Sequence, residues 1–128
     1  MEILLVEHDA EDAATTLRAL RESNLADRLH WVKDGAEALD YLFCSGQYAG
    51  RDPARPPKLV LLGVKMPRID GIEVLRRVRG SELRAVPVVV MASSGEERDV
   101  LKSYHLGAHG YLVKPLQLEA VLELTSLL

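Results

Sequence analysis

The stretch PPKLVLLGVKMPRIDG, residues 56 to 71, contains the pattern that decides the fold. Residues 58–62 are predicted to form a strand, because the apolar run at 59–62 has no polar alternation, which is typical of a strand buried on both faces of a parallel sheet. Asp70 follows after a turn and has Glu73 three residues later, a pattern that predicts the start of a helix. Gly63 stands at the carboxyl end of the strand, where parallel sheets place their chemistry, although glycine has no side chain to offer.

The same unit of strand followed by helix recurs along the chain. Short apolar runs predict strands at 3–6, 29–33, 59–62, 88–91 and 111–113, and apolar residues at helical spacing predict helices at 10–22, 35–44, 71–79, 95–106 and 116–127. Asp9, Asp34, Asp70 and Ser94 each precede an acidic residue three positions later and predict helix starts, and Gly107 predicts a helix end. These units predict one α/β domain over residues 1–128. We expect a doubly wound parallel sheet of five strands.

Composition excludes several classes of protein. The 128 residues are 48% hydrophobic and 27% charged, which is typical of one globular domain. A net charge of −3 without a basic block argues against binding to nucleic acid. No apolar run approaches the ~20 residues that span a bilayer, and the first residues start a strand rather than a signal peptide, so we expect a cytoplasmic protein. The single cysteine, Cys44, falls on an apolar helical stripe and is interpreted as a small core residue.

Four segments carry a family resemblance: ILLVEHD, LVLLGVKMPRIDGIEVLRRVR, PVVVMASS and GAHGYLVKP. Together they resemble the signature segments of the receiver (CheY-like) domains of bacterial two-component response regulators, over essentially the whole chain. The Gly- and Pro-rich loop at 45–57 also resembles small stand-alone receivers that partner bacterial phytochromes. The resemblance implies a flavodoxin-like fold with the strand order 2-1-3-4-5. It also implies a phosphoacceptor aspartate after the third strand, two Mg²⁺-binding acids after the first, a hydroxyl after the fourth and a lysine after the fifth.

This sequence keeps only part of that set. Glu7 matches the first acid and Lys114 matches the lysine, whereas His8, Gly63 and Ala92 stand where the second acid, the acceptor and the hydroxyl belong. The resemblance therefore implies a degenerate receiver that is not an enzyme and that has no cofactor. Mg²⁺ binding is expected to be weak or absent, with Glu7 the only retained acid ligand. Because Glu7 and Lys114 sum to zero charge, a direct contact between them could replace the metal.

Other polar residues near these positions have alternative interpretations. His8 could be a metal ligand or an alternative acceptor, but a polar residue filling a disused pocket is favoured. Ser93 or Ser94 could replace the hydroxyl, although Ser93 comes one residue late and Ser94 is placed to cap a helix. Asp9 and Asp70 are interpreted as helix caps rather than as a ligand and a second acceptor. The remaining histidines are expected to be structural or exposed: His30, His105 and His109.

Three features bear on signalling. Tyr111 matches the family's aromatic switch position, and we expect it to point inward because Ala92 leaves room. Lys65, Met66 and Pro67 keep the family's kinase-docking loop. The last helix has more leucines than one buried face requires, which indicates either a wide core stripe or a partner surface. The leucines concerned are Leu116, Leu124, Leu127 and Leu128.

The sequence predicts a two-component receiver that acts as a phosphorylation-independent protein-interaction module. Its partner would be a sensor histidine kinase, an output protein or a second copy in a homodimer. The alternative is a phosphorelay participant that works through kinase docking or an atypical acceptor. A cofactor-binding flavodoxin-like domain is disfavoured, because the chain has no glycine-rich phosphate loop and its first strand-to-helix turn, EHDAED, is acidic.

Overall fold

The computed structural model describes residues 2–24, 28–66, 68–93, 102, 104–114 and 118–123. Five parallel strands form one sheet in the order β2-β1-β3-β4-β5, which confirms the predicted topology. The strands are β1 (Glu2–Val6), β2 (Arg28–Val32), β3 (Leu59–Gly63), β4 (Val88–Ala92) and β5 (Gly110–Val113). The helices are α1 (Ala10–Ser23), α2 (Gly35–Leu42), α3 (Gly71–Arg79) and α5 (Leu118–Glu123), with a short 3₁₀ helix η1 (Gly46–Tyr48).

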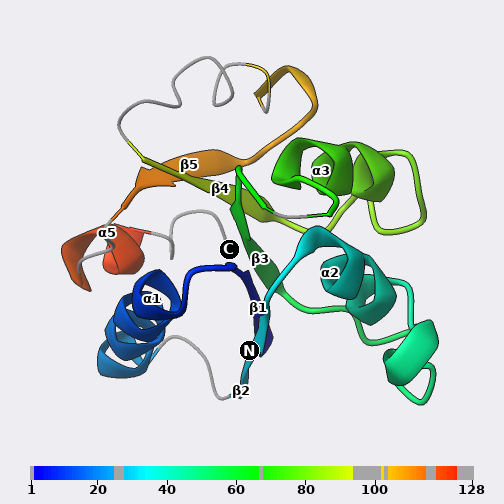
Figure 1. Cartoon of the computed structure of the whole chain (residues 1–128), viewed down its shortest axis with the longest axis horizontal. Coiled ribbons are helices and arrows are strands. Elements are labelled where there is room, and N and C mark those ends of the chain that lie inside the picture. Colours follow the sequence, from blue (N-terminus) through cyan, green and yellow to red (C-terminus); the bar gives the residue numbers. More distant parts are fainter. Residues whose placement is uncertain are drawn as a thin grey trace.

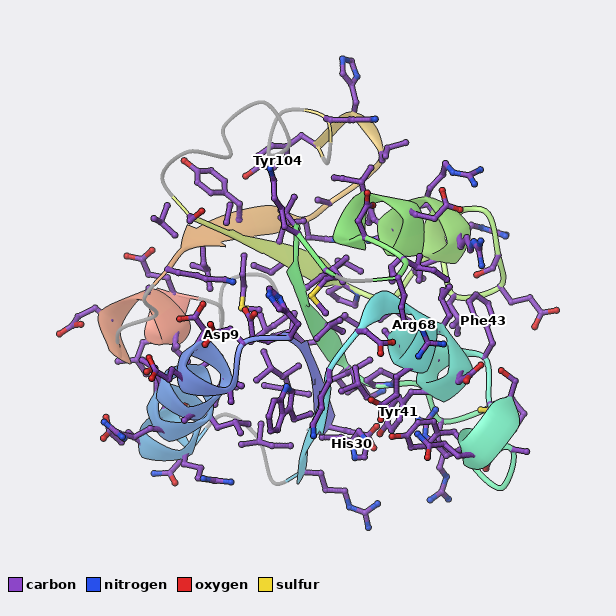
Figure 2. All side chains as sticks on the ribbon, viewed as in Figure 1. Asp9, His30, Tyr41, Phe43, Arg68 and Tyr104 are labelled. Carbon is purple, nitrogen blue, oxygen red and sulfur yellow. The ribbon has the colours of Figure 1, made fainter. Side chains whose placement is uncertain are left out.

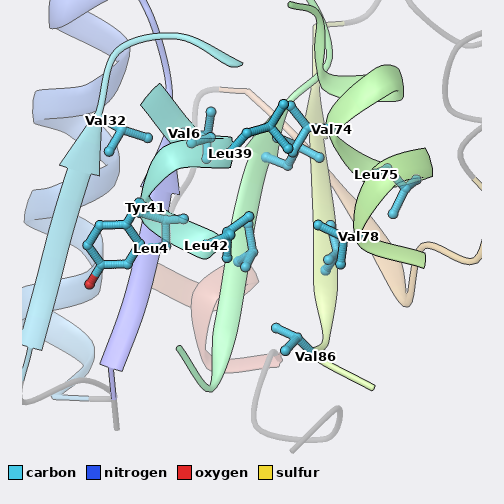
Figure 3. Packing of buried hydrophobic residues seen from close by; sticks show 14 of the residues in the cluster. Leu4, Val6, Val32, Leu39, Tyr41, Leu42, Val74, Leu75, Val78 and Val86 are labelled. Atoms are coloured by element: carbon cyan, nitrogen blue, oxygen red, sulfur yellow. The ribbon is translucent and has the colours of Figure 1, made fainter. Parts of the chain in front are cut away.

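The helices cover both faces of the sheet (Figure 1), with α1 and α5 on one face and α2 and α3 on the other. Alternate residues of the central strands point to opposite faces of the sheet. Leu4 and Val6 therefore pack toward α2 and α3 (Figure 3), whereas Ile3 and Leu5 pack toward α1. Both cores are fully buried, which is why these strands read as unbroken apolar runs in the sequence. No helix in the described ranges has the length and apolarity needed to cross a bilayer.

Side-chain caps fix where the helices begin. Asp9, Asp34 and Asp70 precede α1, α2 and α3, and each carboxylate accepts backbone N–H groups of the first turn. These three predicted caps are confirmed, whereas Ser94 and most of the helix predicted at 95–106 lie outside the described residues. Gly107 has a φ of 97° and its N–H donates to the carbonyl of Tyr104, as expected of a residue that ends a helix.

The chain leaves α2 two residues earlier than predicted. Cys44 has a φ of 54°, so the chain turns away from the helical stripe, and the residue is only partly buried. Its interpretation as a core residue is therefore wrong. Arg51 from the following loop lies 3.7 Å from the Cys44 sulfur and 3.7 Å from the centre of the Tyr41 ring, and it pairs with Glu2. His30 stacks against Tyr41 (Figure 2), and its ring lies within hydrogen-bond distance of the Tyr48 hydroxyl, so β2, α2 and the long loop meet in one cluster.

One close approach positions the loop that follows β3. A Cβ atom on Gly71 would lie 2.1 Å from the carbonyl oxygen of Gly63, and the Gly71 N–H donates to the carbonyl of Val64 at 2.8 Å. The first residue of α3 therefore rests directly on the end of β3, and only glycine fits there. This contact holds α3 against the carboxyl edge of the sheet, where the predicted site lies.

Candidate functional site

The carboxyl ends of β1, β3, β4 and β5 meet along one edge of the sheet. Glu7 follows β1, Gly63 ends β3, Ala92 ends β4 and Lys114 follows β5, and these four strands are neighbours in the order given. Four of the five predicted pocket positions therefore come from adjacent strands. The fifth, His8, follows Glu7 in the turn before α1.

A buried ion pair crosses this edge. The Nζ atom of Lys114 lies 2.6 Å from Oε2 of Glu7, and the two side chains are 19% and 1% exposed. Oε2 accepts no hydrogen bond of regular geometry in the described part of the chain, so the ammonium charge is what satisfies it. The predicted Glu7–Lys114 contact is confirmed. A carboxylate this deeply buried is stable only when a cation accompanies it.

Asp12, on the first turn of α1, is a second acid beside the ammonium group. Its Oδ2 lies 3.5 Å from Lys114 Nζ. Sequence reasoning treated Asp12 only as the acidic partner in the cap of α1. The signal that could have found it is the helical geometry: a residue three positions after the Asp9 cap lies in the first turn, and α1 begins directly beside the edge where Lys114 emerges.

The two acids keep the lysine charged. Burial by itself would lower the pKa of Lys114, but Glu7 and then Asp12 outweigh it and hold the pKa above its ordinary value. At neutral pH the ammonium group of Lys114 is therefore charged and paired with two carboxylates. Its charge is already balanced before any further anion approaches.

The backbone around Glu7 fixes its other oxygen. Oε1 accepts the N–H of Asp9 at 3.1 Å, and the carbonyl oxygen of Glu7 accepts the indole N–H of Trp31 at 2.7 Å. The ring of His8 lies 3.6 Å from Oε1 and is 48% exposed. His8 thus lies at the rim rather than inside the pocket, so it does not fill the pocket as the favoured interpretation expected.

Gly63 leaves space that a methionine fills. A Cβ atom placed on Gly63 would lie 3.2 Å from the sulfur of Met66, 3.2 Å from the carbonyl of Val6 and 3.7 Å from Oε2 of Glu7. Met66 is itself almost fully buried. β3 therefore ends without a carboxylate, and the thioether of the next loop packs beside the position where a side chain would start.

The predicted inward orientation of Tyr111 depended on free space beside Ala92. Ala92 is buried in a small cluster with Val64 and Val90, against which Ile72 and Ala108 pack.

Tyr111 is 49% exposed, and its ring lies edge-on to Tyr104, 5.9 Å away between centroids. The predicted inward orientation of Tyr111 is therefore wrong. Aliphatic side chains fill the space around Ala92, and the tyrosine ring has an aromatic neighbour outside.

The other predicted residues separate into several groups. Asp9 and Asp70 cap helices as expected, and Ser93 is exposed at the end of β4. Lys65 is exposed beside buried Met66, whereas Pro67 lies outside the described residues. The final leucines, Leu116, Leu124, Leu127 and Leu128, and the alternative hydroxyl, Ser94, also lie outside them. His105 and His109 are exposed, and His30 packs in the aromatic cluster described above.

The residues present do not fit Mg²⁺. This ion requires several oxygen ligands in near-octahedral geometry. Glu7 gives one buried carboxylate that already faces an ammonium group 2.6 Å away, and no group of three or more Asp, Glu, His or Cys side chains in the described residues could hold a metal ion. Asp12 and Glu7 converge on Lys114, so the lysine takes the place between the carboxylates that a cation would need.

Comparisons with known proteins agree with this architecture. Residues 3–126 match the response regulator receiver domain. The probable methanogenesis regulatory protein FilR2 of Methanothrix harundinacea is 40% identical over 118 residues, covering 91% of this chain and 74% of that protein. Response regulator Rcp1 of Synechocystis is 33% identical over 125 residues, covering 97% of this chain and 83% of that protein.

Similar solved structures include response regulators of phytochrome systems. The bacteriophytochrome response regulator RtBRR has a TM-score of 0.89 at 44% identity, covering 98% of this chain and 75% of that one. The phosphorylated cyanobacterial phytochrome response regulator RcpA has a TM-score of 0.81 at 35% identity, covering 96% and 86%. The chain therefore belongs to the response regulator receiver domain family, a family of signalling proteins, and is not a catalytic enzyme.

Proposed function

We propose that this receiver domain works in two-component signal transduction by binding a protein partner, without phosphorylation of an aspartate. One observation carries the proposal: the end of β3 has no carboxylate, while the lysine of the pocket is already paired with Glu7 at 2.6 Å. Phosphoryl transfer depends on positioned charges around an acceptor. Here the acceptor position is Gly63, and the charges neutralise one another.

The neighbouring positions support the same function. Ala92 has no hydroxyl to follow a phosphoryl group, and Tyr111 rests outside against Tyr104. The pocket is therefore proposed to stay in one arrangement, with Glu7–Lys114 in the place of Mg²⁺. A module of this kind would present a constant surface to its partner.

A sensor histidine kinase of the phytochrome type is the partner that the relatives favour, since the similar structures include bacteriophytochrome response regulators. The proposed docking loop consists of Lys65, Met66 and Pro67, of which Lys65 is exposed and Met66 anchors the loop in the core. An output protein or a second copy of the chain would use the same kind of constant surface. The final helix, with its additional leucines, is the proposed surface for a homodimer.

The second candidate function is phosphorelay through an atypical acceptor, or through docking to a kinase that phosphorylates another regulator. RcpA, a similar protein, has been solved in its phosphorylated form. His8 is the side chain that such an acceptor role would need, because its ring is half-exposed beside the pocket.

The test is the intact mass of the protein after incubation with acetyl phosphate and Mg²⁺, with Gly63→Asp and Gly63→Ala treated in parallel. We expect no phosphoryl group on the unmodified chain or on Gly63→Ala, which adds the Cβ without the carboxylate. Gly63→Asp places a carboxylate beside Glu7. Labelling of this variant alone would show that the missing acceptor is the main reason why the unmodified chain is not phosphorylated. A phosphoryl group on the unmodified chain would refute the proposal, and its loss in His8→Ala would favour the second candidate.

A further inference from the structure

The imidazole of His109 extends the hydrogen-bond ladder between β4 and β5. The regular pairing begins with Val89 opposite Gly110. One residue earlier, the backbone N–H of His109 donates to the carbonyl of Val88 at 2.8 Å, and the Val88 N–H donates to the ring Nδ1 of His109 at 3.3 Å. A side-chain nitrogen thus takes the acceptor position that a strand carbonyl normally fills.

A second donor meets the same ring nitrogen. Arg79, the last residue of α3, places its Nη2 3.0 Å from Nδ1 of His109. Its other N–H groups donate to the carbonyls of Gly107 at 2.8 Å, Arg84 at 2.8 Å and Val86 at 3.0 Å. Arg79 therefore fastens the segments that lead into β4 and β5 to the end of α3, and His109 completes its set of acceptors.

These two donors determine the protonation state of the ring. A guanidinium group and a backbone N–H can only donate, so Nδ1 must be an unprotonated acceptor and the proton must be on Nε2. An imidazolium carries protons on both nitrogens. It would lose both contacts and would place its positive charge beside Arg79, which faces it from α3. β4 offers the ring only the Val88 amide, and Arg79 is the one charged group found to act on it among the described residues.

We propose that His109 is a pH-sensitive fastener of β5: the neutral ring joins the strand to Val88 and Arg79, and the protonated ring releases it. β5 is an edge strand of the sheet, and it carries Tyr111 and leads directly to Lys114. Acidification would therefore loosen the strand that connects an exposed aromatic pair to the buried Glu7–Lys114 contact. This inference does not depend on whether the chain is phosphorylated.

The sign of the effect follows from the folded-state titration. Burial lowers the pKa of His109 below its ordinary 6.5, and the charge of Arg79 lowers it further. A group with a depressed pKa contributes stability that is fully present above the unfolded pKa. That contribution is lost as the pH falls through the folded pKa. The fastener is thus closed at pH 7.5 and opens as the pH falls through the folded pKa of His109.

The first measurement is a heteronuclear NMR titration of the histidine rings. We expect His109 to be the Nε2–H tautomer at pH 7.5, with a midpoint below 6.5. An Nδ1–H tautomer at pH 7.5, or a midpoint at or above 6.5, would overturn the proposal. This readout does not require any variant to fold.

The second measurement is amide hydrogen exchange, expressed as protection factors to remove the intrinsic effect of pH. Between pH 7.5 and pH 5, protection of the Val88 amide should fall about fivefold, the change that loss of one ordinary hydrogen bond produces.

His109→Asn keeps an acceptor oxygen near the position of Nδ1 but does not titrate, so its Val88 protection should stay constant. His105→Asn, an exposed neighbour, should behave like the unmodified chain. Equal losses in the unmodified chain and His109→Asn, or no loss in either, would refute the role of His109.

Discussion

Removing the ammonium group from the buried pair should cost a large part of the stability of this domain. At 2.6 Å, opposite unit charges at an effective dielectric constant of about 20 attract by roughly 6 kcal/mol before desolvation is subtracted. Loss of one partner from a buried pair typically costs about 3–5 kcal/mol, because the other charge stays behind. Lys114 keeps some access to water, so we expect Lys114→Met to lower the free energy of unfolding by about 3 kcal/mol, which corresponds to a decrease of about 12 °C in Tm.

The assay is urea denaturation followed by the fluorescence of the single tryptophan, Trp31, whose indole N–H bonds to the carbonyl of Glu7. Lys65→Met is the matched control, because Lys65 is exposed and should change stability by less than about 0.5 kcal/mol. The double variant Glu7→Gln/Lys114→Met removes the orphaned carboxylate and should recover about 2 kcal/mol. A loss below about 1 kcal/mol in Lys114→Met, or no recovery in the double variant, would refute the reasoning.

Two further predictions concern the frame around the site. In the same urea assay, Gly71→Ala should lower the free energy of unfolding by about 2–3 kcal/mol, because its Cβ would lie 2.1 Å from the Gly63 carbonyl oxygen. The control Gly50→Ala, with nothing within 4 Å of the added atom, should leave the free energy of unfolding nearly unchanged. Equal losses in the two variants would contradict this prediction. Burial and then a hydrogen bond to Glu2 raise the pKa of Tyr41 to about 12. In an ultraviolet titration of the folded protein, Tyr41→Phe should remove one ionisation near pH 12. The stability that the protonated Tyr41 hydroxyl contributes should be fully present below pH 10 and lost as the pH rises toward 12.

The fold could be predicted almost completely, because its signals are local. Apolar runs bounded by turns gave the strands to within one residue, and Asp9, Asp34 and Asp70 marked the helix starts. The doubly wound arrangement followed from short connections and right-handed crossovers, and the family resemblance implied the order of the strands. The Glu7–Lys114 contact was also predictable, because both residues end strands that share one edge of the sheet.

The errors arose where the outcome depends on packing across the fold. Tyr111 was expected inward because Ala92 is small, but Val64, Ile72 and other aliphatic side chains fill that space. Cys44 matched a helical stripe, yet the chain leaves the helix before it through a positive φ. Asp12 was missed because spacing shows that a residue lies in the first turn of a helix but not which distant side chain it meets.

Under the proposed function, the differences from the receiver pattern at the site form a consistent set. Without a carboxylate at Gly63, an acid pair following β1 would leave two buried negative charges near one lysine, which is costly unless a metal is bound. His8 lies at the rim, so Glu7 is the one buried acid beside Lys114 in the described residues, and Asp12 approaches the same ammonium group from a more exposed position. Met66 packs beside Gly63. Under the proposed function, these features make Mg²⁺ unnecessary, and the Glu7–Lys114 pair itself stabilises the pocket.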